Sequence, residues 1–156
     1  MIYIVCGIAG IGKSTYINSI KNDNDIVISR DAIRFSLLKE GEDYFSKEKQ
    51  VLAIFFKTIR KETAKDDNTA YNIYIDATHL TKKARRKVIN NISNKNRDKV
   101  ACIYFNPDLK KALSQNSNRT GFACVPESAI ADHCKYFEIP TKDEGFCEII
   151  KIEGEK

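Results

Sequence analysis

The sequence predicts an α/β fold with a mainly parallel sheet. Short apolar, β-branched runs alternate along the 156-residue chain with segments whose apolar residues recur at helical spacing. Such alternation is typical of parallel strands joined by helical crossovers. A chain of this length buries enough surface to form a stable core without disulfides or structural metals, and no linker or internal repeat divides it. We therefore expect a single domain over residues 1–156.

The expected elements follow from local patterns. Apolar runs predict strands at residues 2–6, 26–29, 72–76, 100–105 and 147–152, with the last at a sheet edge. Helices are expected from 14, from about 31, and over about 46–65, 81–94, 108–116 and 126–137. Ser46 and Thr81 are expected to cap their helices, and Pro126 suits a first helical turn.

The composition indicates the kind of substrate and the cellular compartment to expect. The net charge of +5 fits an anionic substrate such as nucleic acid, although binding of ATP alone would also account for it. Five scattered cysteines without C-x-x-C spacing indicate reduced thiols in a cytoplasmic protein. No apolar run approaches the ~20 residues of a membrane span, and no secretion signal is visible. Oligomeric state cannot be predicted from these features.

The N-terminal stretch MIYIVCGIAGIGKST carries the most informative motif. It completes the G-x-x-x-x-G-K-[ST] pattern of a phosphate-binding P-loop, between a strand-like run and a helical segment. Its glycines let backbone N–H groups turn toward an anion at the helix N-terminus. Lys13 would reach the β- and γ-phosphates, and the Ser14 hydroxyl would bind Mg²⁺. The expected nucleoside triphosphate site comprises Gly7, Ala9, Gly10, Ile11, Gly12, Lys13, Ser14 and Thr15.

A second candidate group, Ser29 to Arg34, directly follows the second expected strand. Ligands of open α/β sheets bind beyond the carboxyl ends of the strands, which places Asp31 at the active-site edge. An aspartate there can accept the proton of an attacking hydroxyl, and Arg34, one turn later, can hold an acceptor phosphate. The alternative is a helix-capping Asp31 that forms an i, i+3 ion pair with Arg34.

A third group is Tyr74 to His79, where an apolar strand ends in Asp76. This arrangement is typical of a Walker B acid near the Mg²⁺ shell. The basic run that follows is a candidate for phosphate contact, against the alternative of a solvated helix face, and consists of Lys82, Lys83, Arg85, Arg86 and Lys87. Thr78 and Arg86 are candidate substrate-binding residues. His79 is expected to be a polar loop residue or a substrate contact, because no partner is spaced for a metal.

A fourth group lies between the two late helices. Arg119, in the polar loop NSNRTG, is well placed to neutralise charge on a transferred phosphoryl group, against the alternative of a plain surface arginine. Tyr44 and Phe45 could stack on a base, but we expect them to join the core under the following helix.

In this order, GIAGIGKST, ISRDAIR, YIDATHLTKKARR, NSNRTGFACVP and PTKDEGFCEIIKI resemble the polynucleotide 5′-hydroxyl kinases and the small P-loop kinases around them. The resemblance implies a nucleoside-monophosphate-kinase-like, three-layer α/β/α P-loop NTPase fold with a helical lid over about 106–137. Two departures are an extra residue between Asp76 and Thr78 and the lack of a D-x-D-x-T phosphatase motif.

By resemblance, Lys13, Asp31 and Arg119 are catalytic, with Asp31 as general base and Arg119 as lid arginine. Ser14 and Asp76 would hold Mg²⁺, while Arg34, Asp76, Thr78 and Arg86 would face the acceptor. The expected reaction transfers the ATP γ-phosphoryl group to the 5′-hydroxyl of DNA or RNA. One alternative is a kinase for a small hydroxylated metabolite or antibiotic. A second is a nucleotide-binding ATPase or switch without an acceptor.

Overall fold

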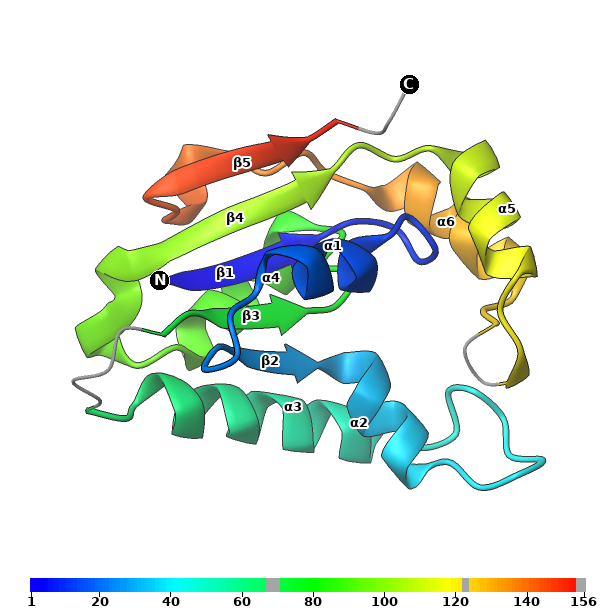
Figure 1. The fold of residues 1–156 in the computed structure, drawn as a ribbon, viewed down its shortest axis with the longest axis horizontal. Coiled ribbons are helices and arrows are strands. Elements are labelled where there is room, and N and C mark those ends of the chain that lie inside the picture. Colours follow the sequence, from blue (N-terminus) through cyan, green and yellow to red (C-terminus); the bar gives the residue numbers. More distant parts are fainter. Residues whose placement is uncertain (67–70, 122–123, 154–156) are drawn as a thin grey trace.

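The computed structural model describes residues 1–66, 71–121 and 124–153. Their central feature is a parallel sheet with the strand order β2-β3-β1-β4-β5. Its strands are β1 (Ile2–Cys6), β2 (Ile26–Ser29), β3 (Ile73–Asp76), β4 (Val100–Phe105) and β5 (Glu148–Ile152). All arrows point toward the end of the molecule where α2, α5 and α6 lie (Figure 1). The carboxyl ends of the strands therefore share one edge, as predicted.

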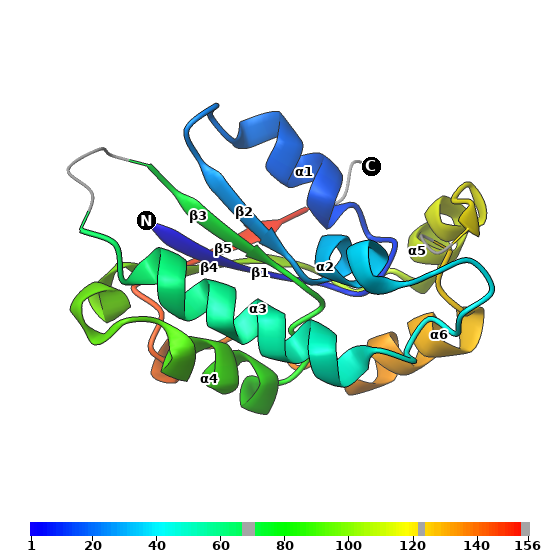
Figure 2. The same ribbon diagram turned by 90° about the horizontal axis from the view of Figure 1, so that it is seen from below.

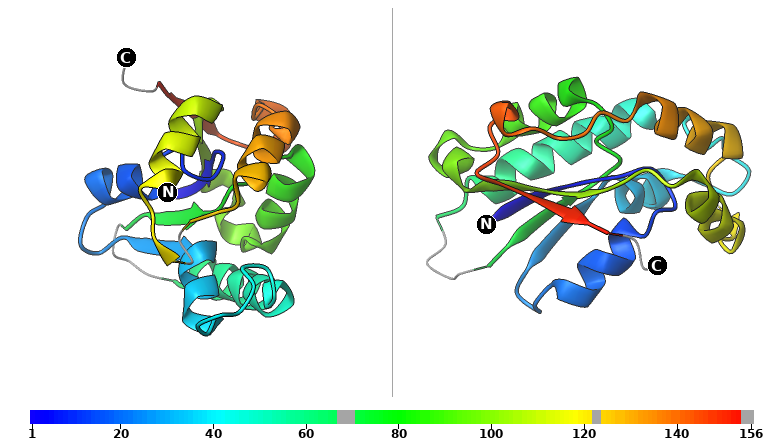
Figure 3. Two further views of the ribbon diagram at one scale, coloured as in Figure 1. Left: turned by 90° about the vertical axis from the view of Figure 1, so that its right-hand side faces the viewer. Right: turned by 90° about the horizontal axis from the view of Figure 1, so that it is seen from above.

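Helices cover both faces of this sheet. They are α1 (Lys13–Ile20), α2 (Arg30–Leu37), α3 (Glu48–Thr63), α4 (Lys82–Asn91), α5 (Leu109–Ser117) and α6 (Glu127–Tyr136), with 3₁₀ segments η1 (Asn94–Lys99) and η3 (Lys142–Glu144). Figure 2 shows α3 and α4 below the sheet and α1 above it. Figure 3 shows α5 and α6 side by side at the carboxyl ends of the strands. The expected three-layer α/β/α arrangement is thus confirmed.

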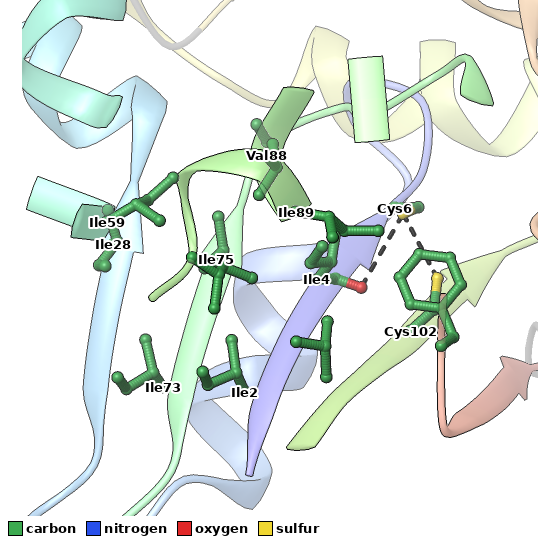
Figure 4. Packing of buried hydrophobic residues seen from close by; sticks show 14 of the residues in the cluster. Ile2, Ile4, Cys6, Ile28, Ile59, Ile73, Ile75, Val88, Ile89 and Cys102 are labelled. Carbon is green, nitrogen blue, oxygen red and sulfur yellow. Dashed lines mark hydrogen bonds between the residues drawn. The ribbon is translucent and has the colours of Figure 1, made fainter. Parts of the chain in front are cut away.

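Alternate residues of the strands supply two apolar cores. Under α3 and α4, residues such as Ile4 and Ile75 pack against Ile59 and Val88 (Figure 4). The Sγ atoms of Cys6 and Cys102 lie 3.6 Å apart in this core, and all five cysteines are free thiols. On the opposite face, Val5 and its neighbours pack against α1, α5 and α6. Both faces of the sheet are therefore buried, as a parallel sheet requires.

The predicted caps are confirmed in part. The Thr81 hydroxyl accepts from Ala84 N at 3.1 Å and opens α4. The prediction for Ser46 is wrong, because α3 begins at Glu48 after Lys47, which makes no side-chain cap. Pro126 precedes the first turn of α6 as its N-cap. Within the described ranges, no helix is long and apolar enough to cross a bilayer.

Candidate active site

One pocket opens at the carboxyl edge of the sheet, where the P-loop, the start of α2, the end of β3 and the α5–α6 region converge. Its lining includes ten of the residues that the sequence singles out. These are Ala9, Gly10, Gly12, Lys13, Ser14, Asp31, Arg34, Asp76, Thr78 and Arg119. Six further lining residues were not predicted as site residues, namely Arg30, Tyr44, Phe45, Ala77, Val125 and His133.

The P-loop is held by contacts from distant parts of the chain. Gly10 has a φ of +82°, and a Cβ there would lie 2.6 Å from the Ala112 carbonyl oxygen of α5. A side chain is therefore excluded by both backbone strain and a clash with backbone. Ala9 N donates to His133 Nδ1 of α6 at 3.3 Å. Because these partners come from α5 and α6, the loop and the expected lid region are packed together.

The side chain of Lys13 turns back over the P-loop. Its Nζ donates to the Ile8 carbonyl at 3.0 Å. Burial lowers the pKa of the Lys13 ammonium, while the carboxylates of Asp76 and Asp31 act in the opposite direction. The lysine thus faces both acids across one pocket, as the P-loop pattern predicts for a group that binds phosphates.

Ser14 and Asp76 meet at the base of the pocket. The Ser14 hydroxyl donates to Asp76 Oδ2 at 2.8 Å, and Asp76 is only 6% exposed. Burial raises the pKa of the Asp76 carboxyl, and Lys13 and the Ser14 hydroxyl lower it. Mg²⁺ in kinases takes one or two protein oxygens together with substrate phosphates and waters. The two oxygens therefore fit a magnesium ion, and the extra residue after Asp76 does not remove the acid from the site.

Asp31 stands at the start of α2, whose N-cap is Ser29. Its side chain is 53% exposed, and Oδ1 accepts from Arg34 Nη1 at 2.5 Å and from the Tyr44 hydroxyl at 3.0 Å. One carboxylate oxygen is thus held by two donors. The carboxylate faces the same pocket as Lys13.

Arg34 is buried and paired. Besides Asp31, it donates to both carboxylate oxygens of Glu48, at 2.8 and 3.1 Å, and it lies 4.5 Å from the Tyr44 ring centroid. The i, i+3 ion pair considered in the sequence analysis is therefore present. Its Nη atoms serve acids of the protein, so contact between Arg34 and an acceptor phosphate remains a prediction.

Two residues that the sequence analysis did not assign to substrate binding stand out beside Asp31. Arg30 lines the pocket, and its Nη2 lies 3.5 Å from Thr78 Oγ1. Its place directly after β2 is the signal that could have singled it out, because the same argument selected Asp31. Phe45 is 51% exposed and lines the pocket, so the expectation that it joins the core is wrong.

Four predicted site residues do not line the pocket. Gly7 N donates to the Thr78 carbonyl at 3.0 Å, and Ile11 is buried among apolar side chains. Thr15 is exposed on α1, and Arg86 is exposed on α4. The neighbour of Arg86, Arg85, is fully buried and paired with Glu144, so the basic run contains a structural residue that its sequence does not reveal.

The glycine loop at the N-terminus of α1 and the parallel sheet beneath it define a P-loop nucleotide-binding protein with the fold of small kinases. Residues 2–140 match the protein-family model described as AAA domain, and the chain belongs to that family. No curated protein matches the chain by sequence.

Several solved structures share the fold. Kti12 from Chaetomium thermophilum, in complex with ADP-AlF3, has a TM-score of 0.67 at 12% identity, over 97% of this chain and 88% of that one. A gluconokinase from Sinorhizobium meliloti 1021 has a TM-score of 0.59 at 15% identity, over 96% and 80%. Shikimate kinase from Acinetobacter baumannii, in complex with shikimate, has a TM-score of 0.50 at 14% identity, over 99% and 84%.

Proposed function

We propose that this protein is an ATP-dependent kinase that transfers the γ-phosphoryl group to the 5′-hydroxyl of a DNA or RNA end. The observation that carries the proposal is the pocket shared by Lys13 and Ser14 of the P-loop and by Asp31 at the start of α2. A donor-phosphate site and an aspartate that can accept a proton thus face each other, as transfer to an alcohol requires.

Three features support a nucleic-acid acceptor. The ordered motifs resemble those of polynucleotide 5′-hydroxyl kinases. Arg30 and Arg119 line the same pocket and supply positive charge for phosphates. The exposed ring of Phe45 offers a surface on which a base can stack.

In the proposed reaction, the acceptor oxygen attacks the γ-phosphorus in line, and the bond to the β–γ bridging oxygen breaks. Oδ2 of Asp31, which accepts no hydrogen bond from the described residues, takes the hydroxyl proton, while Arg34 and Tyr44 hold Oδ1 and orient the carboxylate. Lys13 and Arg119 neutralise charge on the donor phosphates. Mg²⁺, held by Ser14 and Asp76, would supply charge neutralisation on the β- and γ-oxygens when bound. The segment with α5 and α6 serves as the lid.

The alternative acceptor is a small hydroxylated metabolite. A gluconokinase and a shikimate kinase in complex with shikimate share the fold, which supports this alternative. Such an acceptor would use the same Asp31 and P-loop. The third possibility, a switch or ATPase without acceptor, gives the Asp31–Arg34 pair no catalytic task.

The test is transfer of labelled γ-phosphate from ATP, with Mg²⁺, to matched oligonucleotides with a 5′-hydroxyl or a 5′-phosphate. We expect label only on the 5′-hydroxyl oligonucleotide, and a loss of roughly 10²–10⁴-fold in kcat in Asp31→Asn. Asp43→Asn, an exposed acid outside the pocket, is the matched control and should keep wild-type activity. Absence of label on both oligonucleotides, from protein that binds ATP, would contradict the nucleic-acid acceptor.

A further inference from the structure

A second, recessed pocket lies between α3 and α4, next to the active site. Its volume is about 260 Å³. It shares Arg30 and Thr78 with the pocket of the P-loop, so the two spaces meet at these two residues. For an acceptor whose hydroxyl reaches Asp31, this recess is the neighbouring space beyond Arg30.

The walls of the recess are mainly apolar. Phe55 and Phe56 of α3 face Leu80 and Val88, which come from the loop after β3 and from α4. The Lys87 ammonium lies 4.9 Å from the Phe56 ring centroid, at the edge of the recess. Such walls suit a flat ring, whereas the hydroxyl groups of a sugar would lose hydration here without finding enough partners.

His79 lines this space, and its buried ring carries a hydrogen-bond acceptor without a described partner. Its ring is 4% exposed, and Nδ1 lies 2.7 Å from the Val5 carbonyl oxygen, to which it must donate. Burial lowers the pKa of His79 to about 3, so the ring is neutral and Nε2 carries a lone pair. Nε2 has no hydrogen-bond partner in the described chain. A buried acceptor without a partner is costly and calls for an explanation.

The backbone at His79 adds to this observation. Its φ is +45°, and it is the only non-glycine residue with a positive φ in the described ranges. Backbone in this region costs free energy in a residue with a Cβ, and such strain concentrates at binding and catalytic sites. The fold therefore holds the imidazole at the wall of the recess at the expense of backbone strain.

Arg30 stands at the junction of the two pockets. Its Nε also lacks a hydrogen-bond partner in the described chain, and none of its nitrogens forms a described ion pair. Burial lowers the pKa of Arg30, which an anion at the junction would counteract. The junction thus offers a cation between a donor-phosphate site and an apolar recess.

We infer that the recess between α3 and α4 binds a nucleobase of the acceptor, with an N–H of the base edge donating to His79 Nε2 and an adjacent phosphate at Arg30. The inference deepens the proposed function and rests on it for the position of the 5′-hydroxyl at Asp31. A nucleobase can come from the terminal residue of a polynucleotide or from a free nucleoside.

The first experiment compares 5′-hydroxyl oligonucleotides that differ only in whether the terminal residue carries a base or is abasic. We expect KM of the abasic oligonucleotide to be about 5- to 150-fold higher, the range of one stacked base. Equal KM values for the two oligonucleotides would overturn the inference and leave the proposed function standing.

Two matched variants locate the base. Ala84 is exposed on α4 and lines the recess, whereas Ala53 is exposed on α3 and does not. Ala84→Trp should fill the recess and remove the difference between base-bearing and abasic ends, with ATP affinity unchanged. Ala53→Trp should keep the wild-type difference. If Phe45→Ala removes the difference and Ala84→Trp does not, the base stacks on Phe45 and the inference is wrong.

Binding of labelled adenosine, measured by equilibrium dialysis, separates this inference from the proposed function. If no oligonucleotide is phosphorylated, the proposed function fails, and adenosine alone decides about the recess. Saturable binding that Ala84→Trp weakens at least tenfold and Ala53→Trp leaves intact supports a nucleoside site. No binding, or binding that ignores Ala84→Trp, overturns the inference.

Discussion

Side chains of the same type have different roles around the pocket, and their neighbours explain the difference. Arg34 is occupied by the carboxylates of Asp31 and Glu48, while Arg30, four positions earlier, forms no described ion pair. Arg34 therefore orients Asp31, the proposed general base. Arg30 is the better placed of the two arginines to bind a phosphate of the acceptor.

Tyr44 provides a test of how Asp31 is positioned. Its hydroxyl donates to Asp31 Oδ1 at 3.0 Å, and burial raises its pKa to about 12, so the donor keeps its proton over the working pH range. Tyr44→Phe should lower kcat roughly 5- to 20-fold with the Kd of ATP unchanged, because one hydrogen bond to a carboxylate is lost. Tyr136→Phe, 56% exposed on α6, is the control. An unchanged kcat in Tyr44→Phe would exclude this positioning role.

His79 predicts a pH dependence of stability. Its pKa falls from 6.5 to about 3 on folding, chiefly through burial, so between these values the unfolded chain binds more protons. The free energy of unfolding should therefore decrease as pH falls from about 6.5 toward 3, by up to about 1.4 kcal/mol per pH unit from this group.

This prediction is checked by urea unfolding of the wild type and His79→Asn at several pH values. Asparagine tolerates the left-handed backbone that His79 adopts. The stability difference between the two proteins should shrink toward acid. Parallel pH curves would show that His79 is not buried in its neutral form.

At the scale of elements, the chain ties α4 to the segment before β5 through a buried ion pair. Arg85 Nε and Nη2 donate to Glu144 at 2.7 and 2.9 Å, and Arg85 Nη1 donates to the His79 carbonyl at 2.9 Å. Glu144 also closes a capping box with Thr141 in η3. This pair holds the loop after β3, and with it the recess, against the C-terminal segment.

Arg85→Ala should lower the free energy of unfolding by about 3–5 kcal/mol, because it leaves Glu144 buried without its partner. Arg86→Ala changes the exposed neighbour on the same helix and should stay within about 0.5 kcal/mol of the wild type. Urea titrations measure both. Equal stability losses in the two variants would mean that the buried pair has no special weight.

At the scale of the whole molecule, the parallel sheet brings separate sequence segments to one edge. Ser29 of β2 is in register with Asp76 of β3, which is in register with Val5 of β1. The strands therefore end side by side, and Asp31, Asp76 and the P-loop follow them into one pocket. The proposed nucleic-acid acceptor would meet Arg30 and Arg119 in that pocket, on a chain with a net charge of +5.

The salt dependence of the acceptor KM measures this electrostatic contribution. For a single-stranded acceptor, log KM should rise with log salt concentration by roughly 0.7 per phosphate neutralised. Arg30→Gln should reduce the slope by about one phosphate contact. The same measurement on Arg86→Gln tests the sequence-based expectation that Arg86 contacts phosphate. A slope near zero in the wild type would indicate a small neutral acceptor.

The strands and most helix positions could be predicted because they depend on local patterns. The run Ile2–Cys6 before the glycine loop and the acid at the end of β3 carry their periodicity and their motif in a few adjacent residues. The Ser14–Asp76 contact could also be predicted, since Asp76 ends β3 and Ser14 comes after the adjacent parallel strand β1. Ser46 failed as a cap because α3 begins two residues later, at Glu48, after Lys47 as its N-cap.

The sequence alone therefore determined the P-loop, the parallel sheet and the acids at its carboxyl edge, because those signals lie within one strand, loop or helix turn. Only the tertiary structure decided that Arg34 pairs with Glu48, that Arg85 is buried against Glu144, and that α3 and α4 enclose a recess with His79. Arg34 and Glu48 are 14 positions apart in the sequence, and Arg85 and Glu144 are 59 positions apart. The recess is likewise formed by separate elements. A charge or a ring has the same appearance in the sequence whether it meets water or a distant partner, and only packing decides between them.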